Sequence, residues 1–293
     1  MHETHRIQVN EVDVVEQWLV GDVGVWQGRP GDDWRRLGPY PFPVHGLARS
    51  NDTLLVGTGY GLWAAPPDPA GRWVQLHDET LTEVLSVAAT EDGAPVAAGS
   101  YGVAMSTPDE LGLPRWRSLT EEFTPDERYT NVLCLAASDL WLAGTEAGLL
   151  GSTDGGDSWS MTQVNGSPVR SLISVDTVLW AGTDDKGLWR SEDGQAWTRV
   201  DCPTEAVFSI AVAGDFLLVG GYDGIYRRDA EGVWGRSGPR ALIRCLVADG
   251  KTWAAGADPG GLWYSEDEGG SWQRTGPFLR VNAICGPMEG GGS

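Results

Sequence analysis

The sequence predicts an all-β fold, a seven-bladed β-propeller with four antiparallel strands per blade, and three observations support this prediction. Tryptophan recurs along the 293 residues with gaps of 39, 43, 43, 38, 37 and 38 residues, a period typical of propeller repeats. Each period contains a glycine-bounded hairpin pattern. Most units also have a short apolar run before the hairpin. The first unit has none, and the last such run of the chain has no hairpin after it. The periodic residues are Trp34, Trp73, Trp116, Trp159, Trp197, Trp234 and Trp272.

The hairpin pattern consists of two apolar runs separated by a short turn. The first run of each unit closes on a glycine, and a second glycine starts the next run a few residues later. Short apolar runs with such a turn between them predict a β-hairpin, here strands B and C of each blade. The first glycines are Gly21, Gly57, Gly99, Gly144, Gly182, Gly220 and Gly256, and the second are Gly24, Gly61, Gly102, Gly148, Gly187, Gly224 and Gly261.

A further apolar run before each hairpin predicts the innermost strand A. These runs cover residues 44–48, 84–88, 132–136, 169–173, 207–211 and 243–247. The first unit has no such run before its hairpin, and the matching run lies at residues 281–285. A C-terminal strand that completes the N-terminal blade closes the ring and removes its sheet edges. Residues 5–12 also resemble a strand and are an alternative closing or additional outer strand. We expect one domain over residues 1–286 and a tail over 287–293.

Charge and composition narrow the classes of function. A net charge of −20 disfavours nucleic acid as a partner, because phosphate binding needs clustered Lys and Arg. No apolar stretch approaches about eighteen residues and no basic leader precedes one, so we expect no membrane span, no secretory signal and a cytoplasmic location. Cys134 and Cys245 occupy the same predicted position of strand A and are interpreted as small packing residues. The sequence has no Cys-x-x-Cys pair or other metal-ligand spacing, so we expect no metal and no cofactor.

Two segments, residues 152–159 and 265–272, have the pattern Ser-x-Asp-x-Gly-x-x-Trp, and residues 191–197 have a version shortened by one residue. The chain therefore resembles the Asp-box (BNR) propellers, which include sialidases, the sortilin ectodomain and photosystem assembly factors. The motif is interpreted as a structural turn between strands C and D: the carboxylate accepts backbone N–H groups and glycine permits positive φ. Its residues are Ser152, Asp154, Trp159, Ser191, Asp193, Trp197, Ser265, Asp267 and Trp272.

The Asp boxes lie on one face of the predicted ring, and the B–C turns and D–A connections lie on the other, which we call the loop face. Function is expected there. Tyr60, Tyr101 and Tyr222 lie at equivalent B–C turns beside carboxylates such as Glu146 and Asp184. They predict an amphipathic rim for a sugar, a peptide or a planar ligand; ordinary turn chemistry is the alternative. The connection over residues 120–131 is long, acidic and contains two aromatic residues, which indicates either a functional loop or a solvated insertion.

The second residue of the predicted strand A varies in chemistry around the ring, although its neighbours stay small or aliphatic. Arg244, Asn282 and His45 come from consecutive blades and predict a polar arc at the channel mouth that suits a ligand with an anionic or carbonyl group. The alternative is that Arg and His side chains cap loop carbonyls around a solvated channel. In chain order the ring reads His45, Leu85, Leu133, Arg170, Phe208, Arg244 and Asn282.

Three functions follow from these patterns. The first is a non-catalytic, monomeric scaffold that holds a protein partner through the loop face. The second is a small-molecule binder or unusual enzyme at the channel mouth. The third is a sialidase-like or other glycosidase, which the absence of an Arg-Ile-Pro motif and of a six-unit repeat disfavours. The candidate ligand-binding residues are His45, Tyr60, Tyr101, Glu146, Arg170, Asp184, Tyr222, Arg244 and Asn282, and no catalytic residue is assigned.

Overall fold

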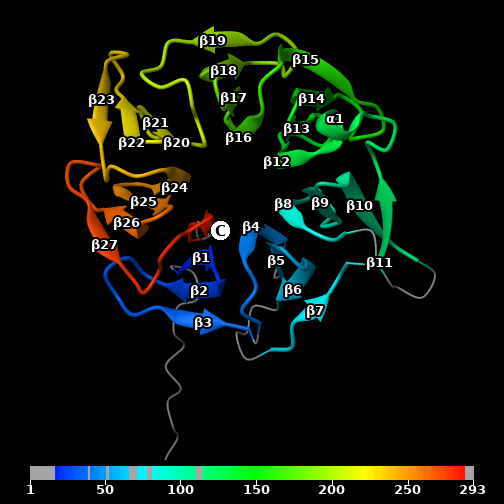
Figure 1. Ribbon diagram of the computed structural model, residues 1–293, viewed down its shortest axis with the longest axis horizontal. Coiled ribbons are helices and arrows are strands. Elements are labelled where there is room, and N and C mark those ends of the chain that lie inside the picture. The colour runs from blue at the N-terminus through cyan, green and yellow to red at the C-terminus, as the bar shows by residue number, and fades with distance from the viewer. Residues whose placement is uncertain are drawn as a thin grey trace, which may run out of the picture.

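The computed structural model describes residues 17–38, 40–50, 53–65, 71–77, 81–109 and 114–287. Seven four-stranded antiparallel sheets stand around a central channel, each with one strand at the channel and one at the rim (Figure 1). The predicted seven-bladed propeller is therefore confirmed. The predicted strand over residues 5–12 and the last six residues of the predicted tail lie outside the described residues.

The first four blades follow the chain order, except that the innermost strand of blade 1 comes from the C-terminus. Blade 1 contains β28 (Ala283–Cys285), β1 (Trp18–Asp22), β2 (Gly24–Gly28) and β3 (Arg35–Leu37). Blade 2 contains β4 (Val44–Ser50), β5 (Thr53–Thr58), β6 (Gly61–Ala65) and β7 (Val74–Gln75). Blade 3 contains β8 (Val84–Ala89), β9 (Pro95–Gly99), β10 (Gly102–Pro108) and β11 (Pro114–Ser118). Blade 4 contains β12 (Thr130–Leu135), β13 (Trp141–Thr145), β14 (Gly148–Ser152) and β15 (Ser160–Asn165).

The last three blades follow the same strand order. Blade 5 contains β16 (Val169–Val175), β17 (Val178–Thr183), β18 (Leu188–Ser191) and β19 (Thr198–Val200). Blade 6 contains β20 (Ser209–Ala213), β21 (Phe216–Gly221), β22 (Gly224–Arg228) and β23 (Trp234–Ser237). Blade 7 contains β24 (Ile243–Asp249), β25 (Thr252–Ala257), β26 (Gly261–Ser265) and β27 (Gln273–Thr275). The long connection before β12 forms one helical turn, α1 (Pro125–Arg128), capped at Thr124 by the Glu127 carboxylate.

The ring is closed by β28, which pairs with β1 in the register Gly21↔Ala283 to Leu19↔Cys285. In Figure 1 the red C-terminal strand accordingly lies beside the blue β1. The approach to β28 is fixed by Phe278, which is 1% exposed and contacts Trp26 and Trp34 edge-on at 5.7 and 5.4 Å between ring centroids. Closure by the C-terminal strand, predicted over residues 281–285, is thus confirmed with a shorter strand.

The glycine one residue before the end of most B strands is explained by packing between neighbouring blades. A Cβ atom added to Gly220 would lie 2.7 Å from Cγ2 of Ile243, the first residue of the next inner strand. The same contact recurs between Gly182 and Val207 at 2.5 Å. Because even a methyl group overlaps the branched side chain, glycine lets adjacent blades approach closely. Equivalent clashes occur at Gly21, Gly57, Gly144 and Gly256.

Hydrogen bonds from inner-strand side chains join several neighbouring blades around the channel. Ser171 Oγ donates to the Val207 carbonyl at 3.4 Å, and Ser209 Oγ donates to the Ile243 carbonyl at 3.2 Å. Cys245 Sγ takes the equivalent place, 3.7 Å from the carbonyl of Val281. Burial raises the pKa of Cys245 to about 12, which keeps the thiol protonated. These contacts confirm Cys245 as a small packing residue of strand A.

Besides β28, two inner strands begin at residues other than the predicted ones. In blade 4 the strand starts at Thr130, which is fully buried and pairs with Thr145, so the strand begins two residues before Val132. Cys134 consequently lies two positions further along its strand than Cys245 does, and their predicted equivalence was wrong. In blade 6 the regular pairing starts at Ser209. The Phe208 N–H still bonds to the Gly220 carbonyl at 2.8 Å.

The two full Ser-x-Asp-x-Gly-x-x-Trp segments form hydrogen-bonded turns between strands C and D. Gly156 N donates to Ser152 Oγ at 2.8 Å, and Ser158 N donates to Asp154 Oδ1 at 2.8 Å. Hydrogen bonds from the Ser158 hydroxyl, which has the largest effect, and from the Ser158 N–H lower the pKa of Asp154 to about 2. Residues 265–271 repeat the geometry, and the pKa of Asp267 is also about 2. Each of the two carboxylates thus accepts a backbone N–H group of its own turn.

The lowered pKa values predict a specific acid sensitivity. The folded-state pKa of each carboxyl lies below the unfolded value of about 3.9, so each contributes stability that is present above pH ~4 and is lost as the pH falls towards about 2. Replacing both residues, as Asp154→Asn with Asp267→Asn, is expected to lower the melting temperature at pH 7 and to flatten its decline between pH 4 and 2. Calorimetry of both proteins across that range measures this. An unchanged decline in the variant would contradict the assignment.

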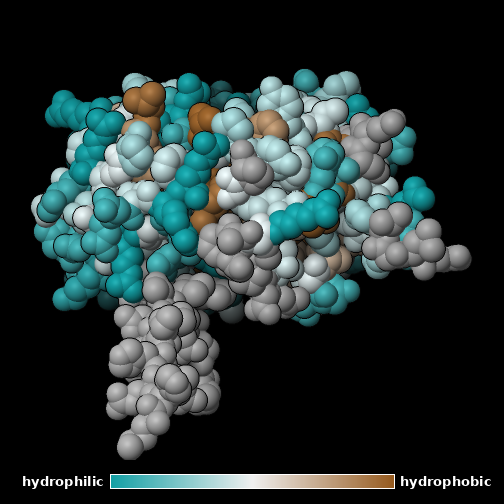
Figure 2. All heavy atoms as spheres, turned by 90° about the horizontal axis from the view of Figure 1, so that it is seen from below, coloured by the Kyte–Doolittle hydropathy of each residue, from teal (hydrophilic) through white to brown (hydrophobic). Residues whose placement is uncertain are grey.

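Seen from the side, the molecule is a flattened body whose rim is mostly hydrophilic, with small separate hydrophobic patches (Figure 2). The apolar side chains are instead buried between blades, in clusters such as the one around Trp141 and Trp159. In the described part of the chain, no helix has the length and apolar character needed to cross a bilayer.

Candidate functional site

The inner strands of all seven blades enclose a cavity of about 470 Å³ along the ring axis. Its lining residues fall into three tiers by sequence position, seven residues per tier, with Ile173 in addition. The upper tier is His45, Leu85, Asn131, Arg170, Phe208, Arg244 and Asn282. The middle tier is Gly46, Ser86, Val132, Ser171, Ser209, Cys245 and Ala283, and the lower tier is Leu47, Val87, Leu133, Leu172, Ile210, Leu246 and Ile284.

The upper tier coincides with a β-bulge at the start of strand A. In blade 5 the pairing passes from Val169↔Thr183 to Ser171↔Gly182, which leaves Arg170 as the extra residue. Blades 2, 3, 4 and 7 have the same register shift. A bulge redirects one side chain without ending the strand. The residue predicted from the sequence lines the upper tier in six of the seven blades.

In blade 4 the upper-tier residue is Asn131, and the predicted Leu133 is wrong. The shift lies between Thr130 and Val132, and Leu133 falls in the lower tier with 8% exposure. The correction removes half of the predicted apolar arc. Polar side chains now occupy five of the seven upper positions, and only Leu85 and Phe208 are apolar.

Arg170 binds protein groups with every nitrogen of its guanidinium. Its Nε and Nη2 contact the two oxygens of Asp184 at 3.1 and 2.7 Å, and its Nη1 lies 2.7 Å from Glu146 and 3.0 Å from Asn131 Oδ1. Burial lowers the pKa of Arg170, but the hydrogen bonds and charges of Asp184 and Glu146 outweigh this and raise it overall. Arg170 thus ties three segments together across the mouth, and its donors are already used.

Arg244 is paired much less completely. Its Nε donates to Asp258 Oδ2 at 2.9 Å, whereas neither Nη nitrogen has a hydrogen-bond partner among the described residues. The side chain is 47% exposed and lines the cavity. A guanidinium offers five N–H donors in a fixed plane. Arg244 therefore presents its Nη edge as an available donor pair at the mouth.

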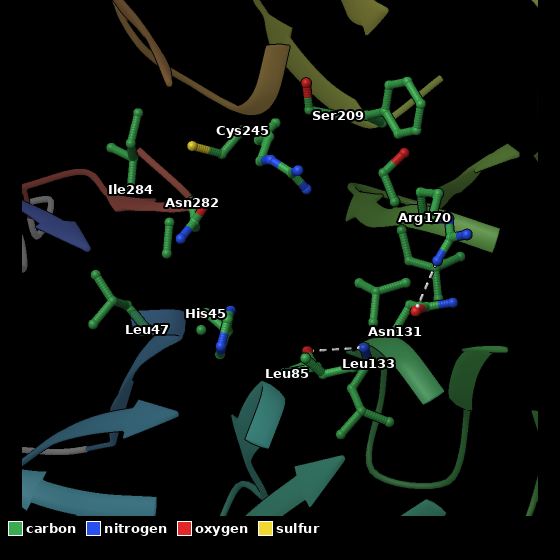
Figure 3. Close-up of a pocket in the computed structure, with 18 of the residues that line it drawn as sticks. His45, Leu47, Leu85, Asn131, Leu133, Arg170, Ser209, Cys245, Asn282 and Ile284 are labelled. Atoms are coloured by element: carbon green, nitrogen blue, oxygen red, sulfur yellow. Dashed lines mark hydrogen bonds between the residues drawn. The ribbon is translucent and has the colours of Figure 1, made fainter. Parts of the chain in front are cut away.

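His45 and Asn282 complete the predicted polar arc beside Arg244. Figure 3 shows both on one side of the cavity, with Arg170 and Asn131 across from them. His45 Nε2 lies 3.8 Å from Glu83. Burial lowers the pKa of His45, the Glu83 charge raises it and the Arg244 charge lowers it, with a net decrease. The imidazole is therefore neutral at pH 7. Asn282 Nδ2 donates to the carbonyl of Val44 at 3.2 Å.

The three predicted tyrosines differ in their surroundings, and none of them is among the residues that line the cavity. Tyr60 and Tyr222 are 63% and 64% exposed on the loop face. Tyr222 packs edge-on against Phe208 at 4.7 Å. Tyr101 is instead packed in the core, its hydroxyl oxygen is buried without a partner among the described residues, and burial raises its pKa. Only Tyr60 and Tyr222 thus form part of an exposed rim.

A row of aromatic side chains that was not predicted lies on the loop face, on the β3–β4 connection and the β5–β6 turn. Tyr40 stacks on Phe42 with 5.4 Å between centroids, and Phe42 contacts Tyr60 at 4.9 Å. Tyr40 also contacts Trp63 at 4.7 Å. We call Tyr40, Phe42 and Tyr60 the aromatic row. The alternating Pro-Tyr-Pro-Phe-Pro of the D–A connection is the signal that was available for it.

The carboxylates considered for glycosidase chemistry are engaged elsewhere. Glu146 and Asp184 each bind the guanidinium of Arg170, which stands between them. A two-carboxylate mechanism instead needs the pair to face a sugar across an open gap. No group of three or more His, Cys, Asp or Glu side chains in the described residues has the arrangement needed to hold a metal ion.

No family model and no curated protein matches the sequence. Many solved structures match the fold. A catalytically inactive variant of virginiamycin B lyase from Staphylococcus aureus, solved with quinupristin, has a TM-score of 0.65 at 12% identity over 88% of this chain and 94% of the lyase. A computationally designed protein has a TM-score of 0.63 at 16% identity, over 85% of this chain and 82% of its own.

A third similar structure belongs to a longer protein. The GH74 enzyme of Niastella koreensis has a TM-score of 0.60 at 17% identity, over 87% of this chain. This chain spans 46% of that enzyme, about half of its length. At such identities the likeness extends to the propeller fold and not to activity.

Proposed function

We propose that the protein is a non-catalytic binding module that holds a protein partner through its loop face. The observation that carries this proposal is the distribution of exposed large apolar side chains. Seven are exposed among the described residues, and five of them lie on B–C turns or D–A connections. Exposed apolar side chains gathered on one face are typical of interaction surfaces. The five are Val23, Tyr40, Tyr60, Tyr222 and Leu279.

Four of these five belong to one sector of the face. Leu279 precedes β28, Val23 joins β1 to β2, Tyr40 precedes β4, and Tyr60 joins β5 to β6. They therefore lie along blades 7, 1 and 2, above the arc of Arg244, Asn282 and His45. We call this region the 7-1-2 sector. Tyrosine supplies large contact area at a small cost in side-chain entropy, which favours it at protein interfaces.

The charges of the B–C turns favour a partner with a cationic surface. These turns and their flanking residues carry six acidic side chains and one lysine, and four of the acids are paired with Arg170, Arg236 or Arg244. The whole protein carries a net charge of −20, so a partner of complementary charge would be attracted and would associate faster at low salt. The residues are Asp22, Glu146, Asp184, Asp185, Lys186, Asp223 and Asp258.

The chain is also proposed to be an Asp-box propeller, in the branch that assembles proteins. The hydrogen bonds from Gly156 to Ser152 and from Ser158 to Asp154 support the turn geometry expected of that motif. This assignment matters for function only because the motif turns lie on the opposite face, which leaves the loop face as the surface that varies.

A second candidate function is the binding of a small molecule in the channel mouth. The Nη donors of Arg244, which have no hydrogen-bond partner in the described part of the chain, lie beside a cavity of about 470 Å³ and favour this function. Such a volume is within the usual range of small-ligand sites, about 300–1,000 Å³.

A capture experiment with two matched variants tests the proposed function. Tyr60→Ser removes an aromatic side chain from the loop face, and Val233→Ser is the control, because Val233 is 62% exposed on a C–D turn of the opposite face. The immobilised protein is incubated with native lysate, the recovered protein is identified, and its affinity is measured after purification. We expect Tyr60→Ser to weaken binding about tenfold or more, the usual effect of a central aromatic contact.

The control variant should bind like the wild type. Weakened binding in Val233→Ser with unchanged binding in Tyr60→Ser would place the interface on the Asp-box face and contradict the proposal.

A further inference from the structure

A second cavity, of about 320 Å³, lies between blades 4 and 5 on the face opposite the loop face, away from the channel. Its walls come from β15, from the A–B turn of blade 4 and from the C–D turns of both blades, which are neighbours in Figure 1. Its volume is within the usual range of small-ligand sites, about 300–1,000 Å³. We call it the inter-blade cavity.

The inter-blade cavity lies where blade 4 lacks a side chain that other blades supply. Gly151 of β14 pairs with Leu142, two residues before the B-strand glycine Gly144. A Cβ atom added to Gly151 would lie 3.8 Å from the carbonyl oxygen of Gly194 in blade 5. A side chain at this position would therefore extend towards the C–D turn of the next blade. The position that pairs in the same way in blades 1, 2, 5, 6 and 7 holds Gln27, Ala64, Arg190, Arg227 and Tyr264.

Blade 6 shows how a long side chain fills this place. Nη1 of Arg227 donates to the carbonyl of Glu268 in the C–D turn of blade 7 at 2.8 Å, and the guanidinium carbon lies 4.9 Å from the ring centroid of Phe216. Leu140 has the place of Phe216 in blade 4, since each comes four residues before the B-strand glycine, and Leu140 lines the inter-blade cavity. The cavity thus occupies the space that Arg227 fills between blades 6 and 7.

The charges beside the inter-blade cavity favour a cation. Ser158 and Gln195, which line it from the two C–D turns, donate their N–H groups to Asp154 Oδ1 at 2.8 Å and to Asp193 Oδ1 at 2.9 Å. Hydrogen bonds lower the pKa of both carboxyls, chiefly from the Ser158 hydroxyl to Asp154 and from the Ala196 N–H to Asp193. Both are therefore charged at pH 7. Among the described residues that line the cavity, none is basic.

We propose that the inter-blade cavity binds an arginine side chain of another polypeptide, in the place that Arg227 takes in blade 6. Leu140 and Met161 offer apolar walls for the aliphatic part of that side chain, and Trp159 offers an aromatic wall on which a guanidinium stacks. A guanidinium is also more weakly hydrated than an ammonium group, which lowers the cost of its burial. The site is separate from the loop face, so this inference goes beyond the proposed function and adds a second interaction surface.

The test uses the tripeptide N-acetyl-Gly-Arg-Gly-amide, whose ends are uncharged, and its analogues with citrulline or lysine in place of arginine. Binding is followed by NMR titration of the nitrogen-15-labelled protein, through the amide signals of Gly151 and Gly194 and the indole signal of Trp159. We expect the arginine peptide to shift these signals and to bind about tenfold or more tightly than the citrulline peptide, because citrulline keeps the shape of the side chain but loses its charge.

Equal binding of the arginine and citrulline peptides would overturn the proposal in favour of a neutral ligand. Equal binding of the arginine and lysine peptides would also overturn it, because it would indicate only a general attraction of cations to a protein with a net charge of −20.

Gly151→Arg should abolish the shifts, because blade 4 then supplies its own side chain to the cavity. The backbone of Gly151 is not left-handed, and the nearest atom to an added Cβ is Thr162 Cγ2 at 3.4 Å, so the variant is expected to fold. Ala64→Arg is the matched control, because it adds the same charge at the same position of blade 2 and should bind like the wild type. Melting temperatures verify that both variants fold. Unchanged shifts in a folded Gly151→Arg variant would overturn the proposal.

The comparison of arginine with citrulline on the wild type gives an answer even if Gly151→Arg does not fold. Tyr60→Ser separates this site from the proposed function. We expect it to leave the binding of the arginine peptide unchanged. Loss of peptide binding in Tyr60→Ser would place the peptide on the loop face and overturn the second site. Peptides that fail to bind, while Tyr60→Ser still impairs partner capture, would overturn the second site and leave the proposed function standing.

Discussion

Deletion of residues 278–293 is expected to leave most of the protein unfolded or aggregated. The deletion removes β28, so β1 loses its inner partner and becomes an exposed sheet edge. It also removes Phe278 and Val281, which are 1% and 0% exposed. Loss of one buried phenylalanine side chain costs about 3–5 kcal/mol, and a whole domain is stable by only about 5–15 kcal/mol. The combined loss is thus comparable with the total stability.

Size-exclusion chromatography and thermal unfolding measure this effect. A shorter deletion of residues 288–293 is the matched control, because it leaves β28 in place. A long deletion that stays monomeric, with the melting temperature of the control, would show that another segment closes blade 1.

Gly220→Ala is expected to destabilise the protein by about 1–3 kcal/mol, the usual cost of overfilling a packed core. The new Cβ would lie 2.3 Å from Ser209 Oγ and 2.7 Å from the Ile243 side chain, so two inner strands have to move apart. Urea unfolding measures the change in free energy.

The control is Gly235→Ala in the outer strand of the same blade, where the nearest atom to the added Cβ is the Arg227 carbonyl oxygen at 4.0 Å. We expect this substitution to change stability by less than about 0.5 kcal/mol. Equal losses in the two variants would contradict the packing account of the recurring glycines.

The number of blades was predictable from the sequence because each blade repeats the same local requirements. Gly220 and its equivalents recur because neighbouring blades meet there, and such a requirement leaves a mark in every repeat. The start of β12 was predicted wrongly because Thr130 fills a place where other blades have valine or isoleucine. Threonine has the shape of valine, so it packs equally well, while its hydroxyl donates to the carbonyl of Arg128 at 2.9 Å.

The candidate site was predictable only in part. The upper tier was predictable because its position follows a repeated pattern. Whether each arginine in it is already paired with carboxylates was not predictable. Arg170 and Arg244 are indistinguishable by position, yet Arg170 binds Glu146 and Asp184, whereas Arg244 pairs with Asp258 alone among the residues that the structure describes. Those partners lie on loops whose length and direction vary between blades. The sequence repeat therefore does not predict which cation is available.

The central claim, that the loop face of the 7-1-2 sector is the binding surface, is tested most directly by hydrogen exchange with and without the captured partner. We expect the partner to slow amide exchange in residues 22–24, 40–43, 59–61 and 278–282, which form the turns and connections of this sector. The C–D turns at residues 153–158, 192–196 and 266–271 should exchange at unchanged rates. Slowed exchange confined to those C–D turns would contradict the account.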